Sequence, residues 1–327
     1  MTDPGRDLDL LVIGELNPDV IVLGAPDRPA FGQAETLVDG ISLTVGSSSA
    51  IAACGAARLG LRVGFIGVVG DDDLGRFLLR ALAERGIDVD ACLVDPVRPT
   101  GASVILGRGG DRAILTAVGA IDALRATDVP SSLFARARHV HVGSLYLQTV
   151  LRPGLASLLV AARAAGATVS VDPNWDPTGR WEPLDDVLAA TDVCLLNASE
   201  AQALTGEMDP TAAARALAAG GHDGLLVVVK LGAVGGLLVS GDQVVQAPAP
   251  RSEVVDTTGA GDSFDAAFIA AWSAGWPLAA CLDLAVVCGS ASTRRPGGVD
   301  GQPTMAEAVG LAMAADRALP STPVGRP

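Results

Sequence analysis

Positive charge is scarce in this 327-residue chain. It has 23 lysines and arginines against 37 aspartates and glutamates, which gives a formal net charge of −14. Proteins that bind nucleic acids carry a basic surface that neutralises phosphates, so this balance argues against a nucleic-acid partner. It argues equally against docking on an anionic membrane. Only 18% of residues are charged and 49% are hydrophobic, a composition typical of a folded globular protein.

The sequence also lacks the marks of an exported or membrane-spanning protein. Its five cysteines are scattered, odd in number and without C-x-x-C spacing, which favours free buried thiols in a reducing compartment. The first residues, MTDPGRDLD, are polar and do not resemble a signal peptide. The apolar run 266–282 is short for a membrane span and is interrupted by Gly275-Trp276-Pro277. We therefore expect a cytoplasmic protein with no membrane partner, in which this run is a core helix.

Several nucleotide-binding and catalytic signatures are missing. A Walker A loop needs Gly-Lys-Ser/Thr, but the only lysine, Lys230, is followed by Leu231. There is no G-x-G-x-x-G, no H-E-x-x-H and no G-x-S-x-G after a strand. His139 and His141 alternate along a predicted strand and point to one face, but a third metal ligand is lacking. A two-histidine metal site is therefore the less favoured interpretation.

The chain instead shows a regular alternation of β-type and α-type patterns. Continuous apolar runs such as LDLLVIGE (8–15) are typical of strands buried on both faces. Helix-forming stretches such as SSAIAACGAARLG (48–60) follow, and the cycle recurs through HVHVGSL, TVSVD, DVCLLN and LLVVVKLG. This alternation predicts an α/β fold with a mostly parallel central sheet flanked by helices, in one domain covering 1–327.

Two stretches interrupt the alternation. Residues from about 20 to 45 contain VIVLG, AETLV and ISLTV, and residues from about 92 to 118 contain ACLVD, ASVILG and RAILTAV. These short strand-like runs are joined by Gly, Pro and Asp turns, with no helix between them. We interpret them as a small β-rich element inserted into the α/β domain.

The stretch DTTGAGDSF (256–264) lies where a strand-like run, 252–255, meets a helix-like run, 263–272. The first N–H groups of a helix lack partners within the helix, and two glycines would let an anion approach them. Asp262 would repel a bound phosphate unless it removes a proton from an attacking group. An anion cradle beside a base is what phosphoryl transfer to a hydroxyl requires. By itself, however, G-x-G-D is more often an ordinary capped helix.

With its flanks, VVDTTGAGDSFDAAF closely resembles the C-terminal signature of the ribokinase-like, phosphofructokinase-B (PfkB) family of carbohydrate kinases. Further stretches are similar to family motifs: GELNPD (14–19), VGSSSAIAACGAARLG with VGFIGVVGDDDLGRFL (45–60 and 63–78), LLNASEAQALTG (195–206) and VVVKLGAVGG (227–236). The resemblance extends from about Leu8 to about Ala314. It implies a kinase that uses ATP and Mg²⁺, with the two β-rich stretches forming a lid over the sugar.

The resemblance also implies roles for individual residues. Asp262 would be the catalytic base, and the N–H groups of Gly259, Ala260 and Gly261 would form an anion hole. The residues that would bind ATP are Asn197, Lys230 (where threonine is frequent), Gly232 and Gly235, together with Gly259 and Gly261 of the anion hole. Glu200 would support Mg²⁺ through water, and a K⁺ site would use Asp256, Thr258 and backbone oxygens near Ala291 and Arg294. The residues that would bind substrate are Asn17, Asp19, Gly46, Ser47 and Asp262.

Some of these residues also have a purely structural interpretation. Asn17 and Asp19 could shape a turn, and Asn197 with Glu200 could form a helix capping box. The polar stretch VDPNWDPTGRW (171–181) could be a surface loop. Ligands bind near the carboxyl ends of parallel strands, however, which makes Asn174 and Arg180 in this stretch candidates for the substrate or nucleotide site.

The sequence leaves the substrate open. The first interpretation is an ATP-dependent sugar kinase; the alternatives are a nucleoside kinase of the same family and a non-catalytic sugar- or nucleotide-sensing protein. Aromatic residues, which stack on purine bases, make up only 3%, and Asp262 is present, so both alternatives are less favoured. A phosphosugar is also a possible substrate, because basic side chains that could bind its phosphate lie in or beside the lid, at Arg28, Arg108 and Arg112. Ribose is a weaker candidate for the substrate, because Ile51 stands where the family usually has a sugar-binding asparagine. We expect the lid to join two subunits in a homodimer.

Overall fold

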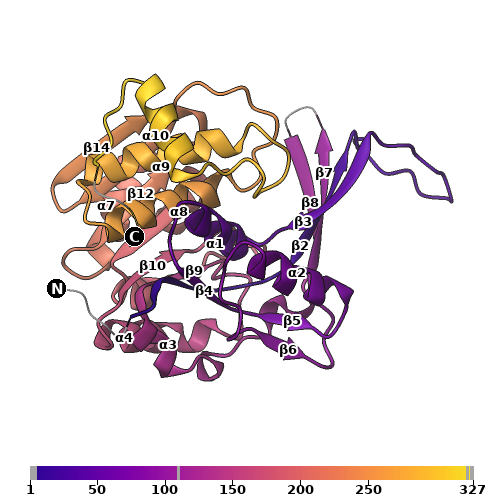
Figure 1. Ribbon diagram of the computed structural model, residues 1–327, viewed down its shortest axis with the longest axis horizontal. Helices are drawn as coiled ribbons and strands as arrows, with labels where there is room; N and C mark the ends of the chain where they lie inside the picture. The colour runs from indigo at the N-terminus through magenta and orange to yellow at the C-terminus, as the bar shows by residue number, and fades with distance from the viewer. Residues whose placement is uncertain (1–5, 109–110, 322–323, 325–327) are drawn as a thin grey trace.

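A central sheet of eight strands forms the body of the protein (Figure 1). The computed structural model describes residues 6–108, 111–321 and 324. The strand order is β14-β13-β12-β11-β10-β9-β1-β4; the strands from β12 to β4 are parallel, whereas β13 and β14 are antiparallel. The strands are β1 (Leu8–Ile13), β4 (Val63–Ile66), β9 (Ala137–Gly143), β10 (Thr168–Asp172), β11 (Val193–Asn197), β12 (Leu226–Lys230), β13 (Gly235–Ser240) and β14 (Gln243–Pro248). The predicted, mostly parallel sheet is confirmed.

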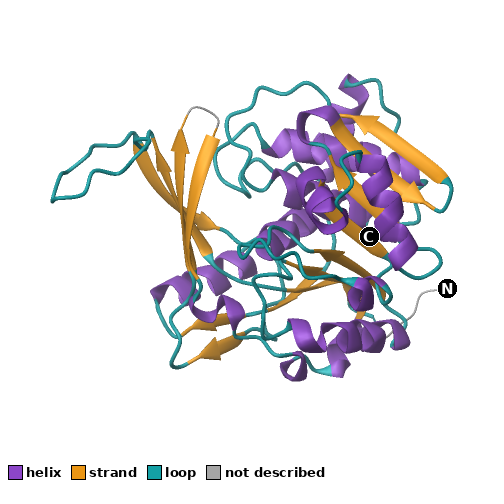
Figure 2. Ribbon diagram, turned by 180° about the vertical axis from the view of Figure 1, so that it is seen from behind, coloured by secondary structure: helices purple, strands orange, loops and turns teal. Residues whose placement is uncertain are grey.

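Helices cover both faces of this sheet (Figure 2). One face packs against α1 (Ser48–Arg58), α2 (Asp73–Ala83), α8 (Ala260–Ser273), α9 (Leu278–Ser292) and α10 (Met305–Ala314). The other packs against α3 (Ser131–Arg136), α4 (Arg152–Ala164), α5 (Asp185–Leu188), α6 (Ala198–Thr205) and α7 (Pro210–Gly220). Each face buries its own apolar cluster, which explains why every residue of β1 is buried.

Helices α8 and α9 come from the apolar run that could be mistaken for a membrane span. Gly275 has a φ of 76° and Pro277 precedes the first turn of α9, so the run is divided into two helices. Residues 262–271 of α8 are all buried. The run therefore belongs to the core, and none of the helices in the described residues is long and apolar enough to cross a membrane.

A second, four-stranded sheet projects from the body, and we call it the lid sheet (Figure 1). It consists of β2 (Pro18–Leu23), β3 (Gly40–Val45), β7 (Ala102–Arg108) and β8 (Asp111–Ala117), in the order β3-β2-β7-β8. Residues paired directly across strands share a face. One row of paired residues consists of Thr44, Asp19, Ser103 and Thr116. The neighbouring residue on each strand points to the opposite face, and these residues form a second row: Leu43, Val20, Val104 and Leu115. One face of the lid sheet therefore carries a polar row, whereas the opposite face carries an apolar one.

Three details differ from the predictions. The segment β6 (Leu93–Asp95), predicted within the lid stretch 92–118, pairs with β5 (Val68–Gly70) in a separate two-stranded sheet. The AETLV run contains no strand and lies in a largely exposed loop between β2 and β3. Residues 252–255 also form no strand, because the N–H groups of Val255 and Asp256 bond the carbonyl of Thr293 at the end of α9.

Candidate active site

Two adjoining cavities lie at the edge of the central sheet where the parallel strands end. The larger, about 750 Å³, lies between the lid sheet and the first turn of α8. The smaller, about 580 Å³, lies between α8, α9 and residues 249–254. Their linings share Lys230, Gly232, Thr257 and Gly261, so the cavities meet beside the N-terminus of α8. In open parallel sheets, this edge is where ligands bind.

The parallel strands bring polar side chains to this edge. Glu15 and Asn17 follow β1, Ser144 follows β9, Asp172 and Asn174 lie at the end of β10, Asn197 ends β11 and Lys230 ends β12. Residues far apart in sequence therefore meet in one place, as the alternation of strands and helices predicted.

The N-terminus of α8 has a bare backbone. Gly259, the N-cap, has a φ of 72°, and a Cβ there would lie 2.6 Å from the Cα of Gly298, so only glycine fits. Gly261 has an ordinary backbone conformation, and a Cβ there would make only normal contacts, the nearest at 3.6 Å to Lys230. Gly259 and Gly261 line the larger cavity, while Ala260 and Gly261 line the smaller. The three predicted anion-hole residues thus lie where the cavities meet.

Asp262 lies in the first turn of α8 and lines the larger cavity. It is only 8% exposed. Burial raises its pKa to about 8, with further contributions from the negative charges of Asp172 and Glu15, against the lowering effects of Lys230 and of a hydrogen bond with Ser48. A carboxyl with such a pKa can exchange a proton near neutral pH, as a general base must.

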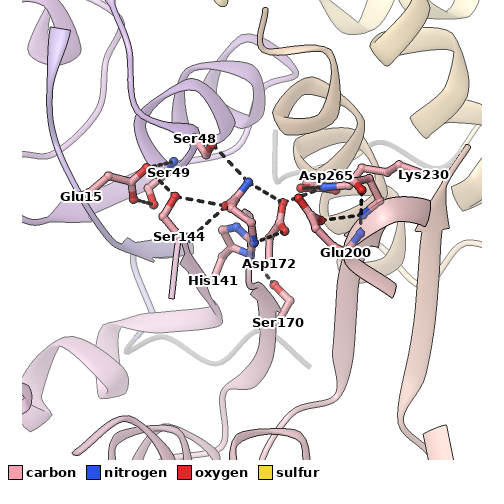
Figure 3. Close-up of polar contacts among 12 residues, drawn as sticks. Glu15, Ser48, Ser49, His141, Ser144, Ser170, Asp172, Glu200, Lys230 and Asp265 are labelled. Atoms are coloured by element: carbon pink, nitrogen blue, oxygen red, sulfur yellow. Dashed lines mark hydrogen bonds and ion pairs between the residues drawn. The ribbon is translucent and has the colours of Figure 1, made fainter. Parts of the chain in front are cut away.

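Lys230, Asp172 and Asp265 form a buried charged triad (Figure 3). Asp262 lies beside it, because one carboxylate oxygen of Asp262 is within 4.8 Å of oxygens of Asp172 and Asp265. The Lys230 ammonium donates to Asp172 at 2.7 Å and to Asp265 at 2.8 Å. Burial raises the pKa of Asp265 well above its usual value, whereas Lys230 brings the pKa of Asp172 below the ordinary range in spite of burial. Among the described residues, the carboxylates of Asp172, Asp262 and Asp265 also form the one group with metal-ligand spacing, but the Lys230 ammonium bonds two of them.

A hydrogen-bond network extends from Asp172 of the triad to Glu15, which lines the larger cavity on the side of β1 (Figure 3). Glu15 is buried and accepts hydrogen bonds from the hydroxyls of Ser49 at 2.5 Å and Ser144 at 2.8 Å. Asn174, which has a φ of 53°, accepts from the N–H of Ser144 and donates to Asp172 and Ser48. This network ties β1, β9, β10 and α1 together, and it fixes Asn174 in the cavity wall.

Asn197 and Glu200 form the capping box that was one of the two predicted interpretations. The Asn197 side chain accepts from the N–H of Glu200, and the Glu200 carboxylate accepts from the N–H of Asn197. Both residues also line the larger cavity. Burial raises the pKa of Glu200 to about 7, with the charge of Asp172 adding to the effect. The capping role is therefore present in a position that a ligand can reach.

The predicted substrate residues cluster at the lid end of the larger cavity. Asn17, Asp19 and Ser47 line it, and Asn17 donates to the hydroxyl of Ser103. Gly46 does not line the cavity, but a Cβ there would lie 2.1 Å from Asp19 Oδ1, so a bare backbone makes room for that carboxylate. Ser47 caps α1 and donates to the carbonyl of Glu15.

The residues predicted for K⁺ are already hydrogen-bonded. Asp256 accepts from the N–H and hydroxyl of Thr258 through one oxygen and from the N–H of Gly297 through the other. The carbonyl of Ala291 accepts N–H groups from Thr293 and Arg294. Thr258 lines the larger cavity, whereas Ala291 and Arg294 line neither cavity.

The two histidines of β9 form part of the core. Both bond the hydroxyl of Ser170, and burial lowers the pKa of His139 to about 3 and that of His141 to about 4. They are absent from the group with metal-ligand spacing found in the described residues. Core histidines are the interpretation that these contacts support.

The structure adds residues that the sequence interpretation did not single out: Glu15, Ser48, Ser144, Asp172 and Asp265. Asp172 could have been found, because it ends a predicted strand at the edge where ligands bind. Asp265 lies within the signature itself, but no local pattern links it to Lys230. Arg180, named with Asn174, is exposed, bonds Thr178 and lines neither cavity.

Comparison with known proteins agrees with this geometry. A family model described as "pfkB family carbohydrate kinase" matches residues 7–305. A fructokinase from Klebsiella pneumoniae is 35% identical over 274 residues, 79% of this chain and 88% of the relative. An ATP-dependent ribose-1-phosphate kinase from Halopiger xanaduensis is 30% identical over 290 residues, 88% of this chain and 93% of the relative.

Solved structures share the fold. Arabidopsis thaliana ribokinase complexed with ribose and ATP superimposes with a TM-score of 0.80 at 25% identity, covering 93% of this chain and 98% of that one. The predicted ribokinase-like fold is thus confirmed, and so is the predicted enzyme class. Because the family model spans nearly the whole chain and the relatives match most of its length, the protein belongs to the pfkB family of carbohydrate kinases.

Proposed function

We propose that the protein transfers the γ-phosphoryl group of ATP to a hydroxyl of a small sugar, with Asp262 as the general base. One observation carries the proposal: a buried carboxyl with a pKa of about 8 lies beside bare helix N–H groups where two cavities meet. A phosphoryl group transferred between ligands in these cavities must pass that point. The mixed apolar and glycine lining of the smaller cavity suits the nucleoside part of ATP.

The chemical step can be written with these groups. The hydroxyl oxygen of the sugar forms a bond to the γ-phosphorus as the bond from phosphorus to the β–γ bridging oxygen breaks, and ADP leaves. The hydroxyl proton passes to Asp262. The N–H groups of Gly259, Ala260 and Gly261 stabilise the negative charge on the phosphoryl oxygens, because the start of a helix carries partial positive charge.

Mg²⁺ fits this site only in an indirect position. The Lys230 ammonium already holds two of the three clustered carboxylates, so direct ligation there is disfavoured. Glu200 lines the larger cavity and would hold Mg²⁺ through water, and the bound ion would neutralise charge on the phosphates. The residues predicted to bind K⁺ are less suited to a cation than Glu200 is to Mg²⁺, because two of them already accept hydrogen bonds through their oxygens. Asp256 accepts three and the Ala291 carbonyl accepts two. We derive no step from a monovalent cation.

The lining of the larger cavity supports a neutral polyhydroxyl acceptor. Hydrogen-bonding groups are offered by Asp19, Ser103 and Thr116 of the lid sheet and by Asn17, which immediately precedes β2. Arg28, considered for a phosphosugar, is exposed and does not line the cavity, while the side chains of Arg108 and Arg112 lie outside the described part of the chain.

An assay of ADP release tests the proposed function. Neutral sugars, polyols, nucleosides and phosphosugars are each supplied with MgATP, and the same compounds are screened by thermal shift with a non-hydrolysable ATP analogue. A ligand at 100 times its Kd adds about 2.7 kcal/mol of apparent stability. We expect a neutral sugar to give both stabilisation and ADP release. Stabilisation without ADP release by any compound would instead support a sensing protein.

Asp19→Ala is expected to weaken sugar binding by about 1–3 kcal/mol, because buried sugar hydroxyls would lose a carboxylate acceptor in a water-poor site. Binding of the ATP analogue should barely change, because Asp19 lies at the lid end of the larger cavity and does not line the smaller. Calorimetric titrations with each ligand measure both effects, and Asp19→Asn serves as a shape-matched control. Equal losses for both ligands would make Asp19 a structural residue.

We also propose that the lid sheet joins two copies of the chain. Its apolar face has two adjacent rows that cross all four strands: Leu43, Val20, Val104 and Leu115, and then Ile41, Val22, Leu106 and Ala113. Ile41 is 68% exposed and Leu115 60%. A continuous apolar patch of this kind on a single chain indicates an interface, and a two-fold dimer would bury the same patch on both copies.

Leu43→Lys is expected to convert the dimer to monomer, because it places a charge on the apolar face, at its β3 edge. Sedimentation equilibrium measures the mass. Ser42→Lys is the matched control, since it adds the same charge at the next residue but on the opposite face of β3. A wild-type monomer would refute the dimer and leave the kinase proposal intact.

A further inference from the structure

The buried triad of Lys230, Asp172 and Asp265 lies where the two cavities meet. The two aspartates are each 1% exposed, and the Lys230 side chain is 11% exposed. Asp265 Oδ2 accepts from Lys230, but its Oδ1 is buried with no hydrogen-bond partner in the described part of the chain. The three residues come from β10, β12 and α8, so the triad links two strands to the helix that carries Asp262.

Stability alone does not account for this triad. Charged groups lose hydration when they are buried, and apolar residues of similar size often stabilise a core as well or better. Burial raises the pKa of Asp265, whereas Lys230 brings the pKa of Asp172 below its ordinary range in spite of burial, so the two carboxyls differ in their electrostatic environment. The result is an ammonium held at a fixed place by two carboxyls.

The position of this ammonium matches the path of the phosphoryl group. Lys230 lines both cavities. A methyl group added at Gly261 would lie 3.6 Å from Lys230 Nζ, so the ammonium and the bare start of α8 face the same space. An anion bound to those N–H groups would therefore lie within reach of Lys230.

The other described charged residues that line the larger cavity are acidic, so the positive charge of Lys230 stands out among them. The cavity's described acidic lining residues are Glu15, Asp19, Glu200 and Asp262, and Lys230 is the one basic residue among the described lining. Within the described lining, Lys230 is therefore the one side chain that offers a positive charge to a phosphoryl group in this cavity.

We propose that Lys230 is a further catalytic residue, whose ammonium contacts the phosphoryl group during transfer, and that Asp172 and Asp265 are positioning residues for it. The inference rests on the function proposed above and adds to it. Lys230 keeps its proton throughout, because the hydroxyl proton goes to Asp262 while the bond to the bridging oxygen of ATP breaks. The ammonium offsets charge on the three equatorial phosphoryl oxygens.

Lys230→Met tests the contact, because methionine keeps the length of the side chain and removes the charge. We expect turnover to fall roughly 10²-fold or more, as when a group that stabilises transition-state charge is lost. Affinity for a non-hydrolysable ATP analogue should fall about tenfold, the size of one charge-assisted hydrogen bond, while affinity for ADP changes little. Equal losses for the two nucleotides would overturn the proposal, since only the analogue has a γ-phosphate.

A measurement on the native chain avoids the risk that Lys230→Met misfolds. Lys230 is the only lysine in the sequence, so protein labelled with ¹³C-lysine gives a single set of lysine side-chain NMR signals. We expect the Cε signal to shift on addition of the ATP analogue and much less with ADP. Equal shifts with both nucleotides would contradict a contact with the transferred group.

Asp265→Asn tests positioning, because the amide keeps the shape and leaves Asp172 to pair with Lys230. We expect kcat to fall about tenfold, with the KM for sugar and the Tm close to those of the wild type. Lys230→Arg keeps the charge and should recover part of the turnover lost in Lys230→Met. A purely structural triad would instead change the Tm and leave kcat unchanged.

If Asp262→Asn is inactive while Lys230→Met keeps full turnover, the proposed function stands and this inference fails.

Discussion

Asp262→Asn is expected to lower kcat by roughly 10²–10⁴, the range typical of the loss of a general base. Asparagine keeps the size of the side chain in the first turn of α8 but cannot accept the hydroxyl proton. Sugar and nucleotide should still bind, because neither cavity changes shape. Steady-state kinetics on the substrate identified by the screen measure the effect.

Two further results would separate a base from a structural acid. Asp73→Asn removes an acid from the first turn of another helix, where the side chain is fully exposed, and should leave kcat unchanged. The pH profile gives the second result. A base works when deprotonated and the pKa of Asp262 is about 8, so kcat/KM should rise with pH and level off above that value. Wild-type turnover by Asp262→Asn would refute the assignment.

The same raised pKa predicts a cost in stability. Between pH 3.8 and about 8 the folded chain holds the Asp262 proton more tightly than the unfolded chain, so this carboxyl makes stability fall as pH rises through that range. Asp262→Asn removes the titration. Above pH 8 the variant should therefore have a higher Tm than the wild type, in spite of its lower activity.

Gly261→Val is expected to lower kcat/KM by roughly 10²-fold or more, because its methyl groups would occupy the space through which a phosphate reaches the N–H groups of α8. The backbone permits the change: Gly261 does not have a positive φ, and its nearest Cβ contact would be 3.6 Å. The fold should therefore survive, in contrast to substitution of Gly259, which would collide with Gly298.

Gly310→Val is the matched control for Gly261→Val. Gly310 lies inside α10, and a Cβ there would meet nothing within 4 Å, so valine has only its ordinary effect on a helix. Circular dichroism checks both folds, and titration with ATP checks the site. If folded Gly261→Val had wild-type kinetics, the phosphate would have to bind elsewhere.

The sequence could predict features that depend on local patterns. Buried strands such as β1 are continuous apolar runs, and α8 begins at a glycine-rich corner with an acid in its first turn, so both were expected close to their observed positions. The capping box of Asn197 and Glu200 was likewise predicted as one of two interpretations, because its partners are three residues apart.

Pairing between distant segments could not be predicted in this way. Nothing within LVD shows that β6 pairs with β5 rather than with the lid sheet. Residues 252–255 have strand-like side chains, but the backbone that follows them bonds to the end of α9. The partners of Lys230 are 58 residues before it and 35 after it, so their meeting depends on the order of the strands and the packing of α8.

The alternation along β2 constrains how this enzyme can evolve. Asp19 and Ile21 face one side of the lid sheet and Val20 and Val22 the other, so inserting or deleting one residue would exchange the two sets. If Asp19 binds the sugar and the apolar face joins two subunits, as proposed above, selection on both functions acts on the same six-residue strand. New specificities should therefore arise more readily at positions such as Ile51 and Trp175, which line the larger cavity from outside the lid sheet. Within a set of homologues, we expect these positions to vary with substrate while the pattern of β2 is retained.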